Sequence, residues 1–108
     1  MNSIESTMLG CVRASRSVTR DNTKVLITGG WSGSVTLWDN TIAIFDGLII
    51  TLFDGDHRTK TTKSRLNALL HGTGYMICAV DFDWRLLYNG QDRGRFKNGT
   101  TFYIGELE

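Results

Sequence analysis

The 108-residue sequence contains no proline, only two cysteines and no long hydrophobic segment. Cys11 and Cys78 lie far apart among apolar neighbours, unlike the closely spaced cysteines of a small secreted disulfide scaffold. Apolar runs such as 48–50 are far too short to span a bilayer, and residues 1–10 lack the apolar core of a signal peptide. We therefore expect a cytoplasmic protein with no membrane partner.

The sequence also lacks an excess of either charge. Twelve Lys and Arg side chains oppose eleven Asp and Glu side chains, so the formal net charge is +1. This balance argues against a protein that binds nucleic acid through bulk charge, and against an acidic mimic of DNA. Hydrophobic residues make up 41% of the chain, as in ordinary globular proteins, so we expect a single domain over residues 1–108.

The middle of the chain has the pattern of a β-meander. Short β-branched and apolar segments alternate with Gly-Gly, Asp-Asn and Asp-Gly pairs, which favour tight turns. Asp39-Asn40 and Asp46-Gly47 are the expected hairpin turns. The strands predicted from this pattern are Lys24–Thr28, Ser34–Trp38, Thr41–Phe45 and Leu48–Phe53.

A helix is predicted over residues 62–71. Leu66, Leu69 and Leu70 give it one apolar face, Thr61 or Thr62 supplies an N-cap, and Gly72 ends it. A short N-terminal helix is also compatible with the spacing of the apolar residues between 4 and 12.

Further strands are expected after this helix. They are predicted over 75–82, 84–88 and 100–107, with a polar, basic loop over 91–98. The sequence as a whole predicts an α+β fold. It consists of a mostly antiparallel sheet of about five or six strands, with one main helix packed on one face.

Motifs for catalysis or metal binding are absent from the sequence. Cys11, His57, His71 and Cys78 do not have the paired spacing of structural zinc ligands, and no G-x-S-x-G elbow occurs. We expect no cofactor, no metal and no enzymatic activity. An enzyme using Asp81, Asp83 or the histidines stays as an alternative, because two aspartates that alternate along a strand share one face.

Candidate binding residues fall in a glycine-rich loop and in two basic segments. Trp31 follows Gly29-Gly30 and is either exposed as a partner anchor or folded back on the sheet. The basic segments either form two separate solvated surfaces or converge into a patch that holds phosphate, with Phe96 or Trp31 stacking on a base. Their residues are Arg58, Lys60, Lys63 and Arg65 in the first, and Arg93, Arg95, Phe96 and Lys97 in the second.

Residues 35–70 resemble a family of small proteins from bacteriophages and mobile elements. The matching motifs are Asn40-Thr41-Ile42-Ala43 in a β-hairpin, then Thr61-Thr62, then Leu66-Asn67 at a helix. The resemblance implies a phage gene product located in the cytoplasm of the host bacterial cell. Short phage proteins without catalytic motifs usually act by stoichiometric binding, which is an argument from association.

The resemblance therefore implies a non-enzymatic binding protein. We expect it to inhibit a bacterial host protein or an antiphage-defence protein, for example in the manner of an anti-CRISPR protein. The alternative is a module that binds nucleic acid or a nucleotide through the basic residues. A homodimer formed through an open sheet edge is a further possibility that the sequence leaves open.

Overall fold

The computed structural model describes residues 1–104 and confirms an α+β fold built mainly from antiparallel strands. Within these residues a six-stranded sheet has the order β1-β2-β3-β4-β5-β9, and a separate three-stranded sheet has the order β6-β7-β8. The elements are α1 (Ser3–Ala14), β1 (Val18–Arg20), β2 (Thr23–Gly29), β3 (Ser32–Leu37), β4 (Asn40–Asp46), β5 (Ile49–Leu52), α2 (Lys60–Leu69), β6 (Tyr75–Val80), β7 (Asp83–Tyr88), β8 (Gln91–Arg95) and β9 (Thr100–Tyr103).

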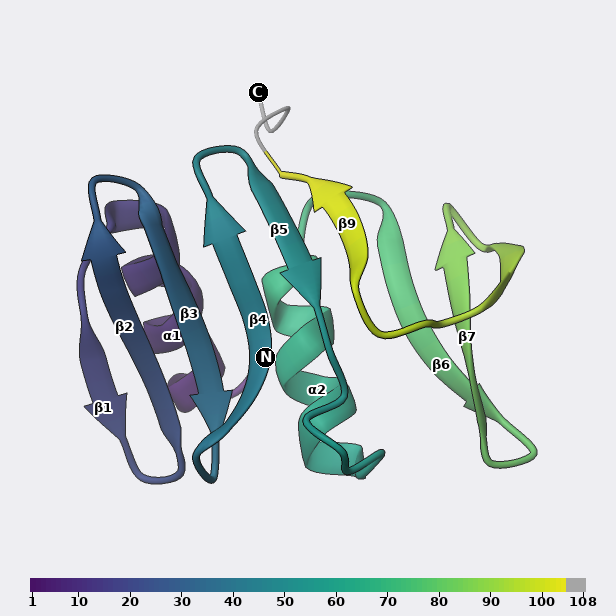
Figure 1. The fold of residues 1–108 in the computed structure, drawn as a ribbon. Helices are drawn as coiled ribbons and strands as arrows, with labels where there is room; N and C mark the ends of the chain where they lie inside the picture. Colours follow the sequence, from purple (N-terminus) through teal and green to yellow (C-terminus); the bar gives the residue numbers. More distant parts are fainter. Residues whose placement is uncertain (105–108) are drawn as a thin grey trace.

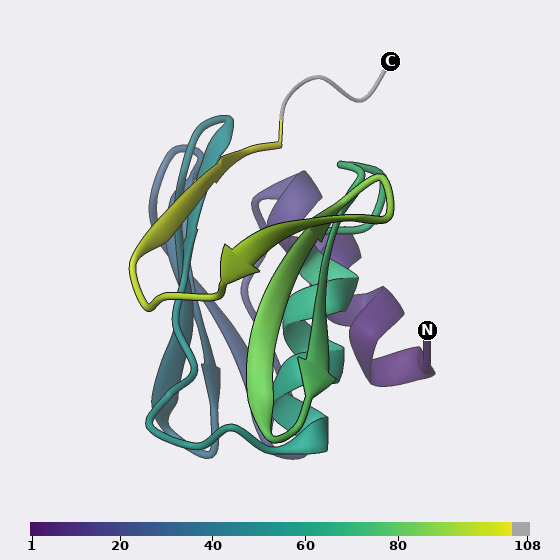
Figure 2. The same cartoon turned by 90° about the vertical axis from the view of Figure 1, so that its right-hand side faces the viewer.

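Both helices lie on the same face of the six-stranded sheet. Helix α1 lies behind β2 and β3, and α2 lies behind β4 and β5 (Figure 1). The three-stranded sheet flanks α2, and β9 returns from it to the edge of the large sheet beside β5 (Figure 2). The core lies between these layers and includes the buried residues Val25, Val35, Phe45, Ile50, Leu66, Leu69, Ile77, Trp84 and Phe102.

The hairpin turns of the large sheet are displaced by one residue from the predicted positions. Leu37 pairs with Asn40, so the β3–β4 turn consists of Trp38 and Asp39, both with positive φ. Asp46 is likewise still in β4, and the β4–β5 turn begins one residue later, at Gly47. The displacement places a large apolar residue in each turn, Trp38 in the first and Leu48 in the second.

Helix α2 begins and ends about two residues earlier than the predicted range of 62–71. Its N-cap is Thr59, whose side chain accepts a hydrogen bond from the Thr62 backbone N–H at 3.1 Å. The predicted apolar face of Leu66, Leu69 and Leu70 is confirmed, since all three side chains are buried. The N-terminal helix that the spacing allowed is α1, which spans twelve residues.

Two predictions for the second half of the chain are wrong. Val80 pairs with Asp83, so Asp81 and Phe82 form a hairpin turn, and Asp81 does not share a strand face with Asp83. The segment Gln91–Arg95, predicted as part of a loop, is strand β8. The side chains of β8 are mostly exposed, so the strand is polar and its sequence resembles that of a loop. The predicted final strand ends at residue 103, and its remainder from 105 lies outside the described residues.

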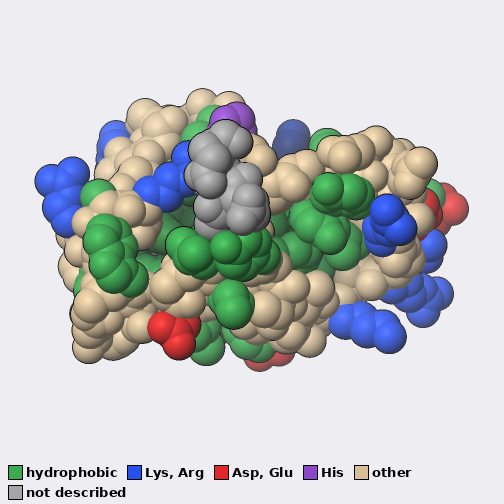
Figure 3. All heavy atoms as spheres, turned by 90° about the horizontal axis from the view of Figure 1, so that it is seen from above, with side chains coloured by type: hydrophobic (Ala, Val, Ile, Leu, Met, Phe, Trp, Pro, Cys, Tyr) green, Lys and Arg blue, Asp and Glu red, His purple; other side chains and the backbone are tan. Residues whose placement is uncertain are grey.

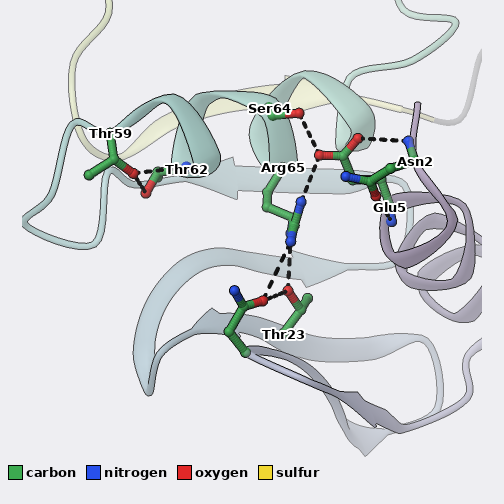
Figure 4. A network of polar contacts seen from close by, with 8 residues as sticks. Asn2, Glu5, Thr23, Thr59, Thr62, Ser64 and Arg65 are labelled. Carbon is green, nitrogen blue, oxygen red and sulfur yellow. Dashed lines mark hydrogen bonds and ion pairs between the residues drawn. The ribbon is translucent and has the colours of Figure 1, made fainter.

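A buried ion pair joins α1, α2 and β2 (Figure 4). Arg65 Nη1 lies 2.8 Å from Glu5 Oε2, and both side chains are nearly inaccessible, at 5% and 4% exposure. Arg65 Nε also donates to the Thr23 hydroxyl at 3.0 Å, and Ser64 Oγ donates to Glu5 Oε2 at 2.5 Å. Glu5 also completes the capping box of α1 with Asn2. The pair therefore fixes how the two helices sit on the sheet.

We expect Glu5 to make the fold sensitive to acid. Burial alone raises the pKa of Glu5, but hydrogen bonds from Ser64, the Asn2 backbone and Arg65 together outweigh it and hold the pKa below the ordinary value of 4.5. A carboxyl whose pKa is depressed in the folded state stabilises the fold above its unfolded pKa. That stabilisation is therefore lost as the pH falls below about 4.5 and through the folded pKa.

The measurement is urea unfolding of the wild type and of Glu5→Gln between pH 6 and pH 3. Asp54 and Asp92 also have lowered pKa values, so the wild type loses stability through several groups. The contribution of Glu5 is the difference between the two proteins, and this difference should shrink as the pH falls. A difference that stays constant over the range would contradict the assignment.

Candidate partner-binding surface

An apolar pocket of about 440 Å³ opens at the end of the large sheet where the β2–β3 and β4–β5 turns lie. Hydrophobic side chains gather at this end when the molecule is seen from above (Figure 3). The lining residues come from α1, both turns, β4 and the residue that follows β9. They are Val12, Arg13, Trp31, Phe45, Gly47, Leu48 and Ile104.

Hydrogen bonds tie the segments around the pocket to one another. The Ser15 hydroxyl, at the C-cap of α1, donates to the Gly30 carbonyl in the β2–β3 turn. The Gly47 N–H donates to the Trp31 carbonyl at 3.1 Å, and the Ile104 N–H donates to the Leu48 carbonyl at 2.7 Å. Since each segment is held by its neighbour, the rim is pre-organised and little ordering is needed when a ligand binds.

Large apolar side chains are exposed at the rim of the pocket and on the strands next to it. Trp31 at one turn is 61% exposed and Leu48 at the other is 53% exposed. Ile49 and Tyr103 are paired across β5 and β9, and both are about half exposed. We call the pocket together with these four side chains the apolar end surface. Contiguous apolar surface on a small protein commonly marks an interaction site, and tryptophan is enriched at binding hot spots.

The floor of the pocket depends on a glycine. Phe45 pairs with Gly33 across β3 and β4, and a Cβ at Gly33 would lie 2.7 Å from Phe45 Cζ and 2.4 Å from the Leu26 carbonyl oxygen. Both distances are shorter than atoms can approach, so the phenyl ring rests where only glycine leaves room.

Gly33→Ala is therefore expected to destabilise the fold by about 1–3 kcal/mol through overpacking. Gly29→Ala is the matched control, because a Cβ at Gly29 in the neighbouring strand meets no atom within 4 Å. Urea unfolding of the two variants measures the difference. Equal stabilities would show that both the Phe45 ring and the Leu26 backbone can move away from the added methyl group.

Trp31 is the predicted binding residue that the structure places at this surface. Its side chain is exposed rather than folded back on the sheet. Sequence reasoning did not select Arg13, Leu48 or Ile104. The signal that could have indicated Leu48 is Gly47, which predicts a turn. When that turn is Gly47-Leu48 instead of Asp46-Gly47, Leu48 lies at its tip.

The basic residues predicted to bind a partner have different surroundings. Arg65 is buried in the pair with Glu5, and Phe96 is buried in the core at 2% exposure, so neither is presented to solvent. Arg58 pairs with Asp54 at 3.0 Å and lies over the Trp84 ring. Arg58 is nevertheless exposed, and the other exposed or partly exposed cations of the two segments are Lys60, Lys63, Arg93, Arg95 and Lys97.

The two basic segments do meet where they flank Asp54. Arg58 Nη2 donates to the Phe96 carbonyl at 3.3 Å, and the Asp54 N–H donates to the Asn98 side-chain oxygen at 2.7 Å. Lys and Arg side chains gather at the end of the molecule that carries the three-stranded sheet (Figure 3). Arg95 there is already paired with Asp83, at 2.9 Å. The local charge is therefore mixed rather than uniformly basic.

The groups considered for catalysis do not form a metal-binding cluster. In residues 1–104, His, Cys, Asp and Glu side chains do not gather in threes. Asp83 forms ion pairs with Arg85 and Arg95, and Asp81 lies in the β6–β7 turn. Neither described helix is long and apolar enough to cross a membrane.

The fold and the surface define a small antiparallel α+β domain with an apolar pocket at one end of its larger sheet. A family model described as Kyanoviridae Gp96 protein matches residues 1–103. The chain therefore belongs to the Kyanoviridae Gp96 family, a family of phage proteins. Neither a curated protein nor a solved structure gives a significant match to the chain.

Proposed function

We propose that this phage protein binds a bacterial host protein or an antiphage-defence protein and inhibits it stoichiometrically, without enzymatic activity. The observation that carries the proposal is Trp31, which stands 61% exposed at the rim of an apolar pocket. A backbone hydrogen bond from the Gly47 N–H to the Trp31 carbonyl holds the turn that bears it. A rigid aromatic side chain beside a pre-formed pocket is the arrangement expected of an interface hot spot.

The proposal is supported by the way the exposed apolar groups are placed. Trp31 and Leu48 come from two different turns and both line the pocket, and Ile49 and Tyr103, paired across β5 and β9, add exposed apolar surface on the strands that adjoin it. Scattered surface apolar residues are normal in soluble proteins, whereas a contiguous group is informative. The phage family adds context, because a phage gene product acts within a bacterial host.

The experiment is affinity purification of the tagged chain from a lysate of the phage's host, with the eluate analysed by mass spectrometry. We expect one host protein in near-equal amount, which is absent when the bait is Trp31→Ala and retained when it is Trp38→Ala. Trp38 is a suitable control because it is 59% exposed in a turn at the opposite end of the sheet. Retention of the host protein by Trp31→Ala would refute the site.

The alternative, a module that binds nucleic acid or a nucleotide, uses Lys60, Lys63, Arg93, Arg95 and Lys97. It has less support because the aromatic side chain between these cations, Phe96, is buried and not available for stacking. Binding of an oligonucleotide in a gel-shift series, weakening as salt rises, would favour this alternative.

A further inference from the structure

Arg13 gives the apolar pocket a positive charge at its rim. Among the described residues that line it, Arg13 is the only ionisable one. Its Nη2 donates to the His71 carbonyl at 3.0 Å, which connects the end of α1 to the segment just beyond α2. A guanidinium carries several N–H donors in a fixed plane, so this bond positions the group and leaves other donors for a ligand.

The size of the pocket limits what it can hold. A volume of about 440 Å³ lies toward the lower end of the range of ligand pockets and suits one or two large side chains. The apolar surface does not stop at the pocket, because Ile49 and Tyr103 extend it over the outer face of β5 and β9. An extended segment of a protein would fill the pocket with one side chain and cover this adjoining surface with the next.

We propose that the pocket takes a linear segment of the partner protein in which a large apolar side chain is flanked, within one or two residues, by Asp or Glu. This inference rests on the proposed function and names the chemistry of the partner. The apolar side chain enters between Trp31 and Leu48, and the carboxylate accepts hydrogen bonds from Arg13. The choice of an acidic segment follows from charge complementarity, since the described lining residues include one cation, Arg13, and no carboxylate.

The test begins with a displayed library of random peptides. Peptides that bind the Trp31→Ala variant are first removed, and the remaining library is then selected for binding to the immobilised full chain. We expect the enriched peptides to share a large apolar residue next to Asp or Glu. A fluorescent peptide with the consensus sequence then provides the probe for affinity measurements by polarisation. Exchanging its acidic residue for Gln is expected to weaken binding to the wild type by about three- to tenfold.

Charge reversal at the rim separates a local contact from a general effect of charge. Arg13→Glu is expected to weaken the acidic probe by about tenfold or more and to favour a probe with Lys in the acidic position. Arg16→Glu is the matched control, because Arg16 is exposed just beyond the same helix, carries the same charge and does not line the pocket. It should leave both affinities within about twofold, since exposed charges that make no contact with the ligand are screened. Thermal melts show whether each variant is folded.

Several outcomes would overturn this inference. One is that the selection yields no peptide whose binding depends on Trp31. Another is that the consensus of the enriched peptides contains no acidic residue. A third is that Arg13→Glu and Arg16→Glu change the affinity for the probe equally. A dimer in sedimentation that is lost in Trp31→Ala would make a second copy the occupant instead. A host protein that is retained through Trp31 while the consensus carries no charge would leave the proposed function standing and refute only this inference.

Discussion

Arg65→Leu is expected to lower the free energy of unfolding by about 3–5 kcal/mol. Leucine fills part of the space of the arginine, but Glu5 would remain buried with a negative charge and no cation beside it. Thr23 would also lose the hydrogen bond from Arg65 Nε. Because a domain of this size has a total stability of about 5–15 kcal/mol, this one substitution removes a large part of it.

The measurement is urea unfolding followed by circular dichroism at pH 7. Lys63→Leu is the matched control, since it replaces a cation by leucine on the same helix at a partly exposed position for which no ion pair with the described residues is found. It should change stability by less than about 0.5 kcal/mol. The double variant Glu5→Leu/Arg65→Leu should be more stable than Arg65→Leu alone, because it leaves no unpaired buried charge. A double variant that is less stable than both single variants would contradict this explanation.

Trp31→Ala is expected to weaken binding of the host protein by about 30- to 1,000-fold, which corresponds to about 2–4 kcal/mol. The indole lies at the rim of the pocket, and its removal takes away a large rigid contact beside the pocket floor. The stability of the free protein should change little, because most of the side chain is exposed to solvent.

This prediction is tested by titration calorimetry with the purified host protein, once the affinity purification has identified it. Trp38→Ala should bind with the affinity of the wild type, because its turn is at the other end of the sheet. Both variants replace an exposed tryptophan by alanine, so they differ only in where the lost side chain lies on the protein. Equal loss of affinity in both would point to a general effect of hydrophobicity and not to the apolar end surface.

The sequence was sufficient to predict the antiparallel meander, because β-branched alternation and turn residues are local signals. The positions of the turns were wrong by one residue, since the register depends on which side chains the core accepts. Asp46, for example, extends β4 and pairs with Ile49. The second sheet was not predicted as a separate unit, because strand β8 is polar and exposed and its signal resembles that of a loop.

The candidate site was predictable only in part. Trp31 was identified from its place in a glycine-rich loop, and that reasoning is local. Arg13, Leu48 and Ile104 come from distant parts of the chain, and nothing in the sequence indicates that their segments meet. Arg65 shows the converse problem. Its position near a helix start suggested a binding cation, whereas its partner is Glu5, a residue 60 positions away that belongs to the protein itself.

The return of β9 to β5 has a consequence for the order in which the molecule is assembled. Trp31 and Leu48 belong to hairpins that join neighbouring strands, so short loop closures form their part of the rim. Ile104 reaches the rim only after the chain has passed through α2 and the whole three-stranded sheet and has added β9 to the edge of the large sheet. Because contacts distant in sequence require more ordering, we expect the pocket to be completed late in folding. A partly folded chain would then expose Trp31 without a complete pocket beside it. We therefore expect only the fully folded protein to bind its partner tightly.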